Sequence, residues 1–495
     1  MEILYKSTRG NGETVTASQA ILQGLSPDGG LFVPTEIPQL KKSLKELSLL
    51  SYQELAYQVM SSFLTDFTEE ELKECIGKAY DSKFDTEEIA PLTEKDGVYF
   101  LELFHGATIA FKDMALSILP HLMTVSARKN HEHREIVILT ATSGDTGKAA
   151  MAGFADVPGT RIIVFYPKNG VSPIQEKQMV TQKGSNTYVV GITGNFDDAQ
   201  TAVKRMFHDQ KLGAELAEAG FLFSSANSIN IGRLVPQIVY YVYAYASLLR
   251  KGNIQEGEKI QVVVPTGNFG NILAAYYAKQ MGLPIERFIC ASNDNKVLYD
   301  FFSTGVYDRN REFILTSSPS MDILISSNLE RLIYRIAGED SSRCKELMEA
   351  LSSQGRYEIT PDMKEQLKDF YGNYASEAET AETIARVFKE TGYMLDPHTA
   401  VAATVYGKFK AQTGDSLLAV IASTASPYKF TRSVMSALGD QYNDMTDFEL
   451  VDKLNQLTGT AVPKAIEEIR TASVLHDRVV SAEEMPAAVK EILGI

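Results

Sequence analysis

At 495 residues, the chain is longer than one hydrophobic core usually organises, so two or three domains are expected. With 44% hydrophobic and 22% charged residues, its composition is that of an ordinary soluble globular protein. The formal net charge of −15 argues against nucleic acids and anionic membranes as main partners. An anionic substrate would therefore have to be attracted by local donors.

The cysteines and the first residues favour a reducing, cytoplasmic setting. Cys75, Cys290 and Cys344 lie far apart and fit neither a disulfide framework nor a metal site, so we expect buried thiols. Residues 1–10 have no apolar core of a signal peptide, and no uncharged run approaches the roughly 18 apolar residues of a membrane span. No histidine pair has metal-ligand spacing with carboxylates, so no metal site is predicted.

The predicted elements fall into three parts. Residues 1–92 form an N-terminal segment with a charged helical pattern over 40–79. Residues 93–258 are expected to form a smaller α/β lobe, with strands over 135–140, 161–166, 187–190 and 221–223 and helices over 146–155, 175–182 and 197–208. Residues 259–495 are expected to form a larger lobe, with a strand over 259–264, a helix over 272–281, a helical insertion without strands over about 326–391 and a strand over 417–422. Short β-branched runs joined to helices predict buried parallel strands in an α/β sandwich.

Lys112 is the candidate nucleophile. Residues 102–104 read as the end of a strand and 105–108 as a turn, and Ile109 begins a helical pattern with one apolar face. Lys112 would lie in the first helical turns, where poor solvation and the positive end of the helix dipole disfavour an ammonium ion. A free amine of this kind can act as a nucleophile. The same pattern also fits a surface lysine whose stem lies along apolar residues.

Two glycine-containing loops follow predicted strands and open predicted helices. In residues 142–147, Ser143, Asp145 and Thr146 accompany two glycines, but Ala149 stands where a P-loop needs Ser or Thr. Residues 265–271 read Pro-Thr-Gly-Asn-Phe-Gly-Asn and lack the glycine spacing of a dinucleotide site. Backbone N–H groups at a helix N-terminus attract anions, so the second loop predicts a phosphate site. Each loop also fits a purely structural turn.

Two further stretches carry polar donors. Asn227 and Ser228 precede Arg233 after a predicted strand, which suits either a phosphate or a solvated arginine beside capping residues. Thr424 follows the last predicted strand. Strand carboxyl ends line the ligand crevice of an open α/β sheet, so its hydroxyl suits a ring nitrogen, or it only ends the strand in a turn. His398, like His105, sits inside a tight motif and has no assigned role.

Considered together, these stretches favour one kind of chemistry. An amine in a poorly solvated position and two anion-binding loops point to pyridoxal phosphate acting on an amino-acid substrate. The whole pattern resembles the threonine synthase family, in its longer bacterial and fungal type. The resemblance is carried, in order, by residues 7–10 and 24–31, HGATIAFKD at 105–113, TATSGDTGKAA at 140–150, SSANSIN at 224–230 with Arg233, PTGNFGN at 265–271, residues 318–323, 326–328 and 395–400, and Ser-Thr-Ala at 423–425. These matches cover most of the chain.

The resemblance implies a fold and an activity. The fold is that of type II pyridoxal phosphate enzymes, similar to the tryptophan synthase β subunit. It has two open, mostly parallel twisted sheets flanked by helices, with an N-terminal helical segment and a helical insertion. The implied reaction, the last step of threonine biosynthesis, converts O-phospho-L-homoserine and water to L-threonine and phosphate. The implied cofactor is pyridoxal 5′-phosphate, and the implied location is the cytoplasm.

The resemblance also implies roles for single residues. Lys112 would be the Schiff-base lysine and the main proton shuttle, Thr424 would hydrogen-bond the ring nitrogen, and Asp145 would meet the ring oxygen of the cofactor. The cofactor phosphate would be held by Gly267, Asn268, Phe269, Gly270 and Asn271. The substrate would be bound by Ser143 and Thr146 near its carboxylate and by Asn227, Ser228 and Arg233 at its phosphate.

Two departures and two alternatives stay open at this point. Ser426 stands where many members of the family carry His, and Tyr428 where they carry a small residue, so substrate contacts there are undetermined. On the same fold, a phospho-lyase that releases 2-oxobutyrate, or a relative that makes a sulfur or sulfonate amino acid, is the nearest alternative. A non-catalytic binding protein is the second, and the intact Lys112 argues against it because a binder needs no reactive amine.

Overall fold

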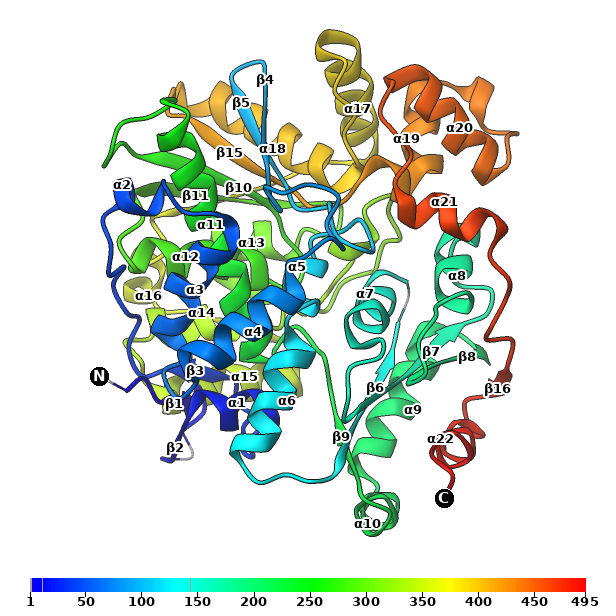
Figure 1. The fold of residues 1–495 in the computed structure, drawn as a ribbon. Helices are drawn as coiled ribbons and strands as arrows, with labels where there is room; N and C mark the ends of the chain where they lie inside the picture. Colours follow the sequence, from blue (N-terminus) through cyan, green and yellow to red (C-terminus); the bar gives the residue numbers. More distant parts are fainter. Residues whose placement is uncertain (1, 11, 143) are drawn as a thin grey trace.

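The computed structural model describes residues 2–10, 12–142 and 144–495. Figure 1 shows two lobes side by side, each built on its own sheet. The sheet of the larger lobe has the strand order β14 (Phe370–Tyr374), β11 (Ile285–Ser292), β10 (Ile260–Pro265), β15 (Ala419–Ser423), β5 (Val98–Glu102) and β4 (Leu92–Lys95). All its neighbours pair in parallel except β4, which runs antiparallel to β5.

The smaller lobe contains a fully parallel sheet of five strands. Their order is β16 (Val479–Ser481), β8 (Thr187–Thr193), β7 (Thr160–Pro167), β6 (Glu135–Ala141) and β9 (Phe221–Ser224). Its helices are α7 (Asp145–Phe154), α8 (Pro173–Val180), α9 (Phe196–His208), α10 (Gln210–Glu218) and α22 (Met485–Leu493). The central strands β6 and β7 are apolar and buried over most of their length, as strands covered by helices on both faces must be. The expected α/β fold with two mostly parallel sheets is confirmed.

The N-terminal segment packs on the larger lobe. It contains the small antiparallel sheet of β1 (Tyr5–Ser7), β2 (Thr14–Val15) and β3 (Phe32–Pro34) and the helices α1 (Ala17–Gln23), α2 (Leu44–Leu47), α3 (Tyr52–Phe63) and α4 (Glu69–Ala79). All four helices begin with a Ser or Thr and a Gln or Glu three residues later, whose side chains and backbone N–H groups bond reciprocally. The charged helical pattern of residues 40–79 is thereby explained.

A long buried helix, α11 (Ile231–Arg250), runs through the larger lobe. It spans 20 residues, and all but the last two are buried. A helix that is apolar on every side belongs in a core. It packs against α3, α5 (Asp113–Leu116), α6 (Leu119–Lys129) and α12 (Gly270–Gln280), so its N-terminus is held rigidly next to the site described below.

The remaining elements follow the strands of the larger sheet. They are α13 (Val297–Thr304), β12 (Val306–Asp308), η1 (Pro319–Met321), α14 (Leu329–Ile336), α15 (Ser341–Gln354), β13 (Arg356–Glu358), α16 (Pro361–Glu365), α17 (Glu377–Thr391), α18 (Pro397–Thr413), η2 (Pro427–Phe430), α19 (Thr431–Leu438), η3 (Asp440–Tyr442), α20 (Asp447–Thr458) and α21 (Lys464–Thr471). The chain then returns to the smaller lobe, where α21 packs on α8 and β16 extends the sheet (Figure 1).

The structure differs from the sequence expectations in two elements and in the course of the domains. Residues 326–391 are mostly helical, but they also contain β13 and β14, and β14 is an edge strand of the larger sheet. Its sequence Phe-Tyr-Gly-Asn-Tyr has no β-branched residue, which explains the miss. The helix expected from Ile109 begins at Asp113. Each sheet also contains a strand from outside its expected residue range. β5 was expected in the smaller lobe but belongs to the larger sheet, and β16 was expected in the larger lobe but belongs to the smaller sheet.

All three cysteines are free and buried, as expected. Among the described residues, no helix is both long and apolar enough to cross a membrane.

Helices α5 and α7 approach each other closely at Gly153. A Cβ atom at this position would lie 2.1 Å from the carbonyl oxygen of Leu116 in α5, so only glycine allows the contact. The contact matters for the site because α5 begins directly after Lys112 and α7 begins with Asp145.

We predict that Gly153→Ala lowers the free energy of unfolding by about 1–3 kcal/mol, because backbone atoms must move apart. Gly77→Ala is the matched control: it lies inside α4, where a Cβ meets nothing within 4 Å. There alanine should stabilise by about 0.5–1 kcal/mol. Urea unfolding curves measure both effects, and equal midpoints for the Gly153 variant and the parent would contradict the prediction.

Candidate active site

Lys112 is held at the carboxyl edge of the larger sheet. The segment between β5 and α5 runs along the end of β15, where the N–H of Phe111 donates to the carbonyl of Thr424 over 2.8 Å. Ile109 has a φ of 53°, an unfavourable conformation for a β-branched residue that persists only where the surroundings enforce it. Lys112 follows as the first residue flanking α5. Ligands of open α/β sheets bind at this edge.

The amine of Lys112 lies in a buried, charged environment. Its Nζ donates to Ser320 Oγ over 3.2 Å and lies 3.9 Å from Asp145 Oδ2, and 13% of the side chain is exposed. Burial lowers the pKa of Lys112 from 10.5 to about 8, against the opposing charge of Asp145 and with help from the positive charges of Arg233 and Lys429. Neutral amine is therefore available near neutral pH, as a nucleophile or base requires.

Asp145 is the carboxylate that faces this amine. It is the first residue of α7 and accepts hydrogen bonds from Ser320 Oγ over 3.0 Å and from Gln175 Nε2 over 3.1 Å. The ammonium of Lys429 lies 3.3 Å from its Oδ1. Burial alone would raise the pKa of Asp145, but the charges of Lys429 and Lys112 hold it well below its usual range. Asp145 is thus a buried, ionised carboxylate.

The N-terminus of α12 is the cradle that the sequence predicts for a phosphate. The carbonyl of Gly267 accepts from Ser326 Oγ over 2.6 Å, and that of Asn268 accepts from the N–H of Asn328 over 3.0 Å. Among the described residues, no hydrogen bond occupies the backbone N–H groups of residues 267–271. These free donors stand at a helix N-terminus, which favours an anion such as a phosphate.

The shape of this cradle depends on two residues within it. A Cβ at Gly267 would lie 2.4 Å from the carbonyl oxygen of Ser320, so glycine is required there. Phe269 adopts a left-handed φ of 66°, and its ring is fully buried against Phe302 and Phe370. Phe269 therefore contributes its backbone to the cradle and its side chain to the core.

Arg233 forms a second cationic position at the start of α11. Its Nη1 donates to the carbonyl of Ala226 over 3.0 Å, whereas its Nε is buried with no hydrogen-bond partner. Burial lowers the pKa of Arg233 to about 10. A buried guanidinium with an unused N–H is costly unless an anion binds it. Arg233 therefore fits a ligand contact better than a structural role.

The predicted neighbours of Arg233 precede it in the chain and differ in exposure. Asn227 is exposed and Ser228 is half-buried on the turn before α11. The amide of Asn328 donates to the carbonyls of both Ser228 and Asn268, over 3.3 and 3.0 Å. This one side chain joins the Arg233 segment to the cradle at α12. The structure thus brings the two predicted anion positions next to each other.

Thr424 and its neighbours end strand β15. Thr424 is buried, and its hydroxyl has no hydrogen-bond partner among the described residues. The side chain of Ser426 instead accepts from the N–H of Tyr428 over 3.3 Å and caps the η2 turn. The hydroxyl of Tyr428 donates to the carbonyl of Thr460 over 2.5 Å. The two departures from the family pattern thus serve local turn structure and packing, whereas the hydroxyl of Thr424 is free of bonds to the described residues.

The loop before α7 supplies further donors. Thr142 Oγ1 accepts from the N–H groups of Gly144 and Gly147, each over 3.0 Å, and so fixes the turn. Thr146 is half-buried, and its hydroxyl makes no hydrogen bond with the described part of the chain. Ser143, which the sequence assigned to the substrate, lies outside the described residues.

Three residues of the site carried no role in the sequence analysis: Ser320, His398 and Lys429. Ser320 contacts Lys112 and Asp145, and its backbone N–H donates to His398 Nε2 over 3.2 Å. The Nζ of Lys429 is fully buried and donates to the carbonyl of Thr108 over 2.9 Å. A signal existed for each, because Ser320 and His398 lie in the stretches that carried the resemblance and Lys429 sits between two aromatic residues. None of these signals specified a contact.

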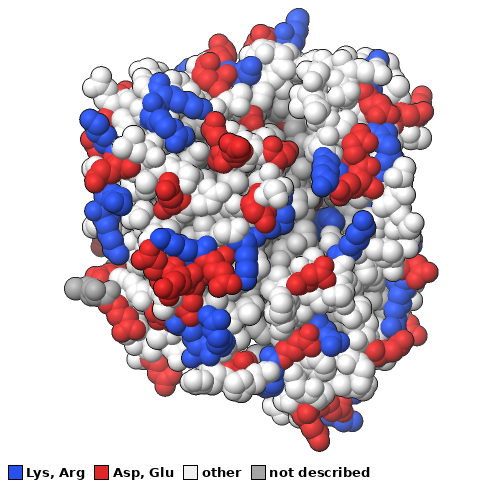
Figure 2. All heavy atoms as spheres, in the orientation of Figure 1, with Lys and Arg blue, Asp and Glu red and all other residues white. Residues whose placement is uncertain are grey.

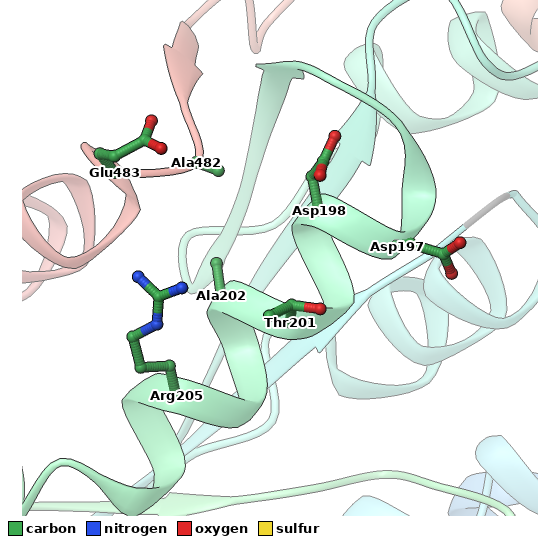
Figure 3. Close-up of a pocket in the computed structure, with 7 residues that line it drawn as sticks. All are labelled: Asp197, Asp198, Thr201, Ala202, Arg205, Ala482 and Glu483. Atoms are coloured by element: carbon green, nitrogen blue, oxygen red, sulfur yellow. The ribbon is translucent and has the colours of Figure 1, made fainter.

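One hollow on the surface away from this site is a poor place for an anionic ligand. Figure 3 shows a hollow of about 180 Å³ between α9 and the segment before α22. Asp197, Asp198 and Glu483 line it beside one cation, Arg205, so it would repel a phosphate. On the face in Figure 2, Lys and Arg side chains are interspersed with Asp and Glu.

Known proteins place the chain in a family. Three family models match it in succession: the threonine synthase N terminus at residues 4–80, the pyridoxal-phosphate dependent enzyme at 85–423 and the threonine synthase C-terminal model at 399–492. The chain belongs to the threonine synthase family.

Individual relatives agree with this assignment. The chain is 36% identical to threonine synthase of Saccharomyces cerevisiae over 466 residues, which cover 88% of this chain and 89% of the yeast protein. It is 43% identical to human threonine synthase-like 1 over 434 residues, 85% of this chain but only 58% of that longer protein. The structure of pyridoxal-phosphate-bound threonine synthase from Brucella melitensis has a TM-score of 0.88 at 34% identity and is matched over 100% of both chains.

The residues present fit the cofactor of this family, pyridoxal phosphate. The free N–H groups of residues 267–271 suit its phosphate, and the amine of Lys112 suits its aldehyde carbon. The unpaired hydroxyl of Thr424 suits its ring nitrogen. These three features converge, because Ser320 contacts both Lys112 and Gly267, and Thr424 is bonded to Phe111.

We predict that cofactor attachment to the apo-protein follows the titration of Lys112. Only the neutral amine attacks an aldehyde, so the attachment rate should rise with pH and level off above about 8, rather than near 10.5. Visible absorbance after mixing with pyridoxal phosphate measures the rate, and Lys112→Arg should show no attachment.

Two charge variants test the sign of this prediction. Lys429→Met removes a positive charge that lowers the pKa of Lys112, so the midpoint should move to higher pH. Asp145→Asn removes the negative charge that raises this pKa, so the midpoint should move to lower pH. An unchanged midpoint in both variants would show that burial alone controls the amine.

Proposed function

We propose that this protein converts O-phospho-L-homoserine and water into L-threonine and inorganic phosphate. The pairing of one buried amine, Lys112, with two separate anion-binding positions carries the proposal. A phosphorylated cofactor and a phosphorylated substrate together need two such positions, here residues 267–271 and Arg233. The family membership of the chain supports the same reaction.

The cofactor would be held by residues 267–271 at its phosphate and by Thr424 at its ring nitrogen. A threonine hydroxyl is neutral, so it would leave this nitrogen largely unprotonated. Asp145 would face the ring oxygen, on the side of the site where Lys112 and Lys429 balance its charge. When bound, pyridoxal phosphate would accept the electron pair left at the substrate's Cα after its proton departs.

Lys112 would move the protons. Its amine has a pKa lowered to about 8, which suits a base that works near neutral pH. After the substrate displaces it from the cofactor, it would take the proton from Cα and then act at Cβ. Its contact with Ser320 over 3.2 Å would keep the amine within the site during these steps.

Arg233 would bind the departing phosphate. Elimination of the γ-phosphate transfers negative charge to the leaving group, and a preorganised guanidinium stabilises that charge. The unused Nε–H of Arg233 gives it a donor for this contact, and the nearby Asn227 and Ser228 add amide and hydroxyl donors. Water then adds at Cβ, and the product is threonine.

The start of α7 would bind the substrate's carboxylate. No hydrogen bond among the described residues occupies the N–H groups of Asp145 and Thr146 or the hydroxyl of Thr146. These donors lie at the positive end of a helix dipole, which favours a carboxylate. Ser143 is proposed for the same contact from its place in the sequence.

We also place the enzyme in the cytoplasm, where three free cysteines stay reduced.

The proposed reaction is tested by its products. The holoenzyme, supplied with O-phospho-L-homoserine, should release threonine and phosphate in equal amounts, measured by amino-acid analysis and a phosphate assay. Release of 2-oxobutyrate in place of threonine would identify a phospho-lyase instead. Release of neither product would overturn the proposed substrate.

The role of Arg233 is tested by Arg233→Met, which keeps an unbranched apolar stem but removes the guanidinium. Loss of a charge-assisted contact of order 1.5–3 kcal/mol should lower kcat/KM by roughly 10–150-fold. Cofactor absorbance should remain, because residues 267–271 hold that phosphate. Arg250→Met at the other end of α11 is the matched control and should leave kcat/KM unchanged. Lost cofactor absorbance with unchanged substrate affinity would reverse the two anion sites.

A further inference from the structure

Ser320 is the residue through which Lys112, Asp145 and His398 meet. Its hydroxyl accepts from Lys112 Nζ over 3.2 Å and donates to Asp145 Oδ2 over 3.0 Å. Its backbone N–H donates to His398 Nε2 over 3.2 Å. The residue belongs to η1, a three-residue turn that is also anchored by the amide of Asn293, which donates to the carbonyl of Ser318 and to Asp322 Oδ1, and by the buried side chain of Met321. The contact from His398 acts on Ser320 itself.

His398 is preset to accept the N–H of Ser320. A backbone N–H can only donate, so Nε2 carries the lone pair and the ring proton lies on Nδ1, 2.8 Å from Asp396 Oδ1. Asp396 caps α18, and its carboxylate also accepts from the N–H groups of His398 and Thr399 and from the hydroxyl of Thr399. Both His398 and Asp396 are buried. Hydrogen bonds thus connect Asp396 to His398 and His398 to Ser320 without a gap.

We propose that Ser320 is a positioning residue for the Lys112 amine, and that His398 acts through Ser320 by fixing the η1 turn. The hydroxyl of Ser320 has one proton, which it donates to Asp145, so its lone pairs face the amine and can only accept from it. This contact fixes one N–H of the amine and thereby aims its lone pair. The inference rests on the proposed function only through the role of Lys112, whatever the substrate is.

Four charged groups also face the amine of Lys112: Asp145 from α7, Lys429 from η2, Arg233 from α11 and Asp113 from α5. They decide the fraction of amine that is neutral at a given pH. Ser320 is uncharged, so its contribution is separable from theirs. Orientation affects the rate at high pH, where the amine is fully neutral, whereas charge affects the pH of the midpoint.

The test measures cofactor attachment to the apo-protein without substrate, as a function of pH. In Ser320→Ala the attachment rate on the high-pH plateau should fall about tenfold, the size of one lost hydrogen bond to a charged or reactive group. Ser320→Thr keeps the hydroxyl and should stay within about threefold of the parent. The urea unfolding midpoints of both variants should match the parent. A wild-type plateau in Ser320→Ala would overturn the proposal.

The arm that tests His398 uses a second pair of variants. His398→Gln offers a neutral acceptor to the N–H of Ser320 and should keep most of the plateau rate, whereas His398→Leu should lower it as Ser320→Ala does. In the double variant of Ser320→Ala and His398→Leu the losses should not add, because both act on one contact. Additive losses would show that His398 acts independently of Ser320. Since no substrate is present, failure of the proposed reaction would leave these outcomes unchanged.

Discussion

The carboxylate of Asp145 is the interaction on which the arrangement of the site depends. It belongs to the smaller lobe, whereas Ser320 and Lys429, which bond to it, belong to the larger lobe. Burial disfavours its charge, yet the ammonium groups of Lys429 and Lys112 keep its pKa well below the usual range. The same ion pairs hold the two lobes in register. The contacts that balance the charge of Asp145 are thus also the contacts that position one lobe against the other.

Two buried arginines differ in how their nitrogens are paired. Burial lowers the pKa of both Arg233 and Arg331 to about 10. All three nitrogens of Arg331 donate, to the carbonyls of Phe32 and Ile229 and to the side chain of Asn328, so it ties the N-terminal segment to the loop before α11. Arg233 donates from its Nη1, but its Nε has no partner among the described residues, which suits the ligand contact proposed for it.

The sequence predicted the layers, and the two loops at 142–147 and 265–271 that join a strand to a helix, because these depend on local signals. Buried strands such as β6 are short apolar runs, and the Gly-Asn-Phe-Gly-Asn loop follows another such run. The contacts of Ser320 and Lys429 could not be predicted from the sequence, since they join residues far apart in the chain. The strand β14 was missed for a related reason: its place at the edge of the sheet comes from pairing with β11, which overrides a weak local propensity.

The strand β16 has a consequence for how the molecule is made. It pairs with β8, although most of the chain, including the whole larger sheet apart from β4 and β5, is synthesised between the two. Until residues 479–481 emerge, one edge of β8 lacks this partner, and unpaired edges of this kind invite association with other chains. The nascent smaller lobe is therefore open to aggregation or chaperone binding while the residues between β8 and β16 are made, and closure of its sheet waits for β16.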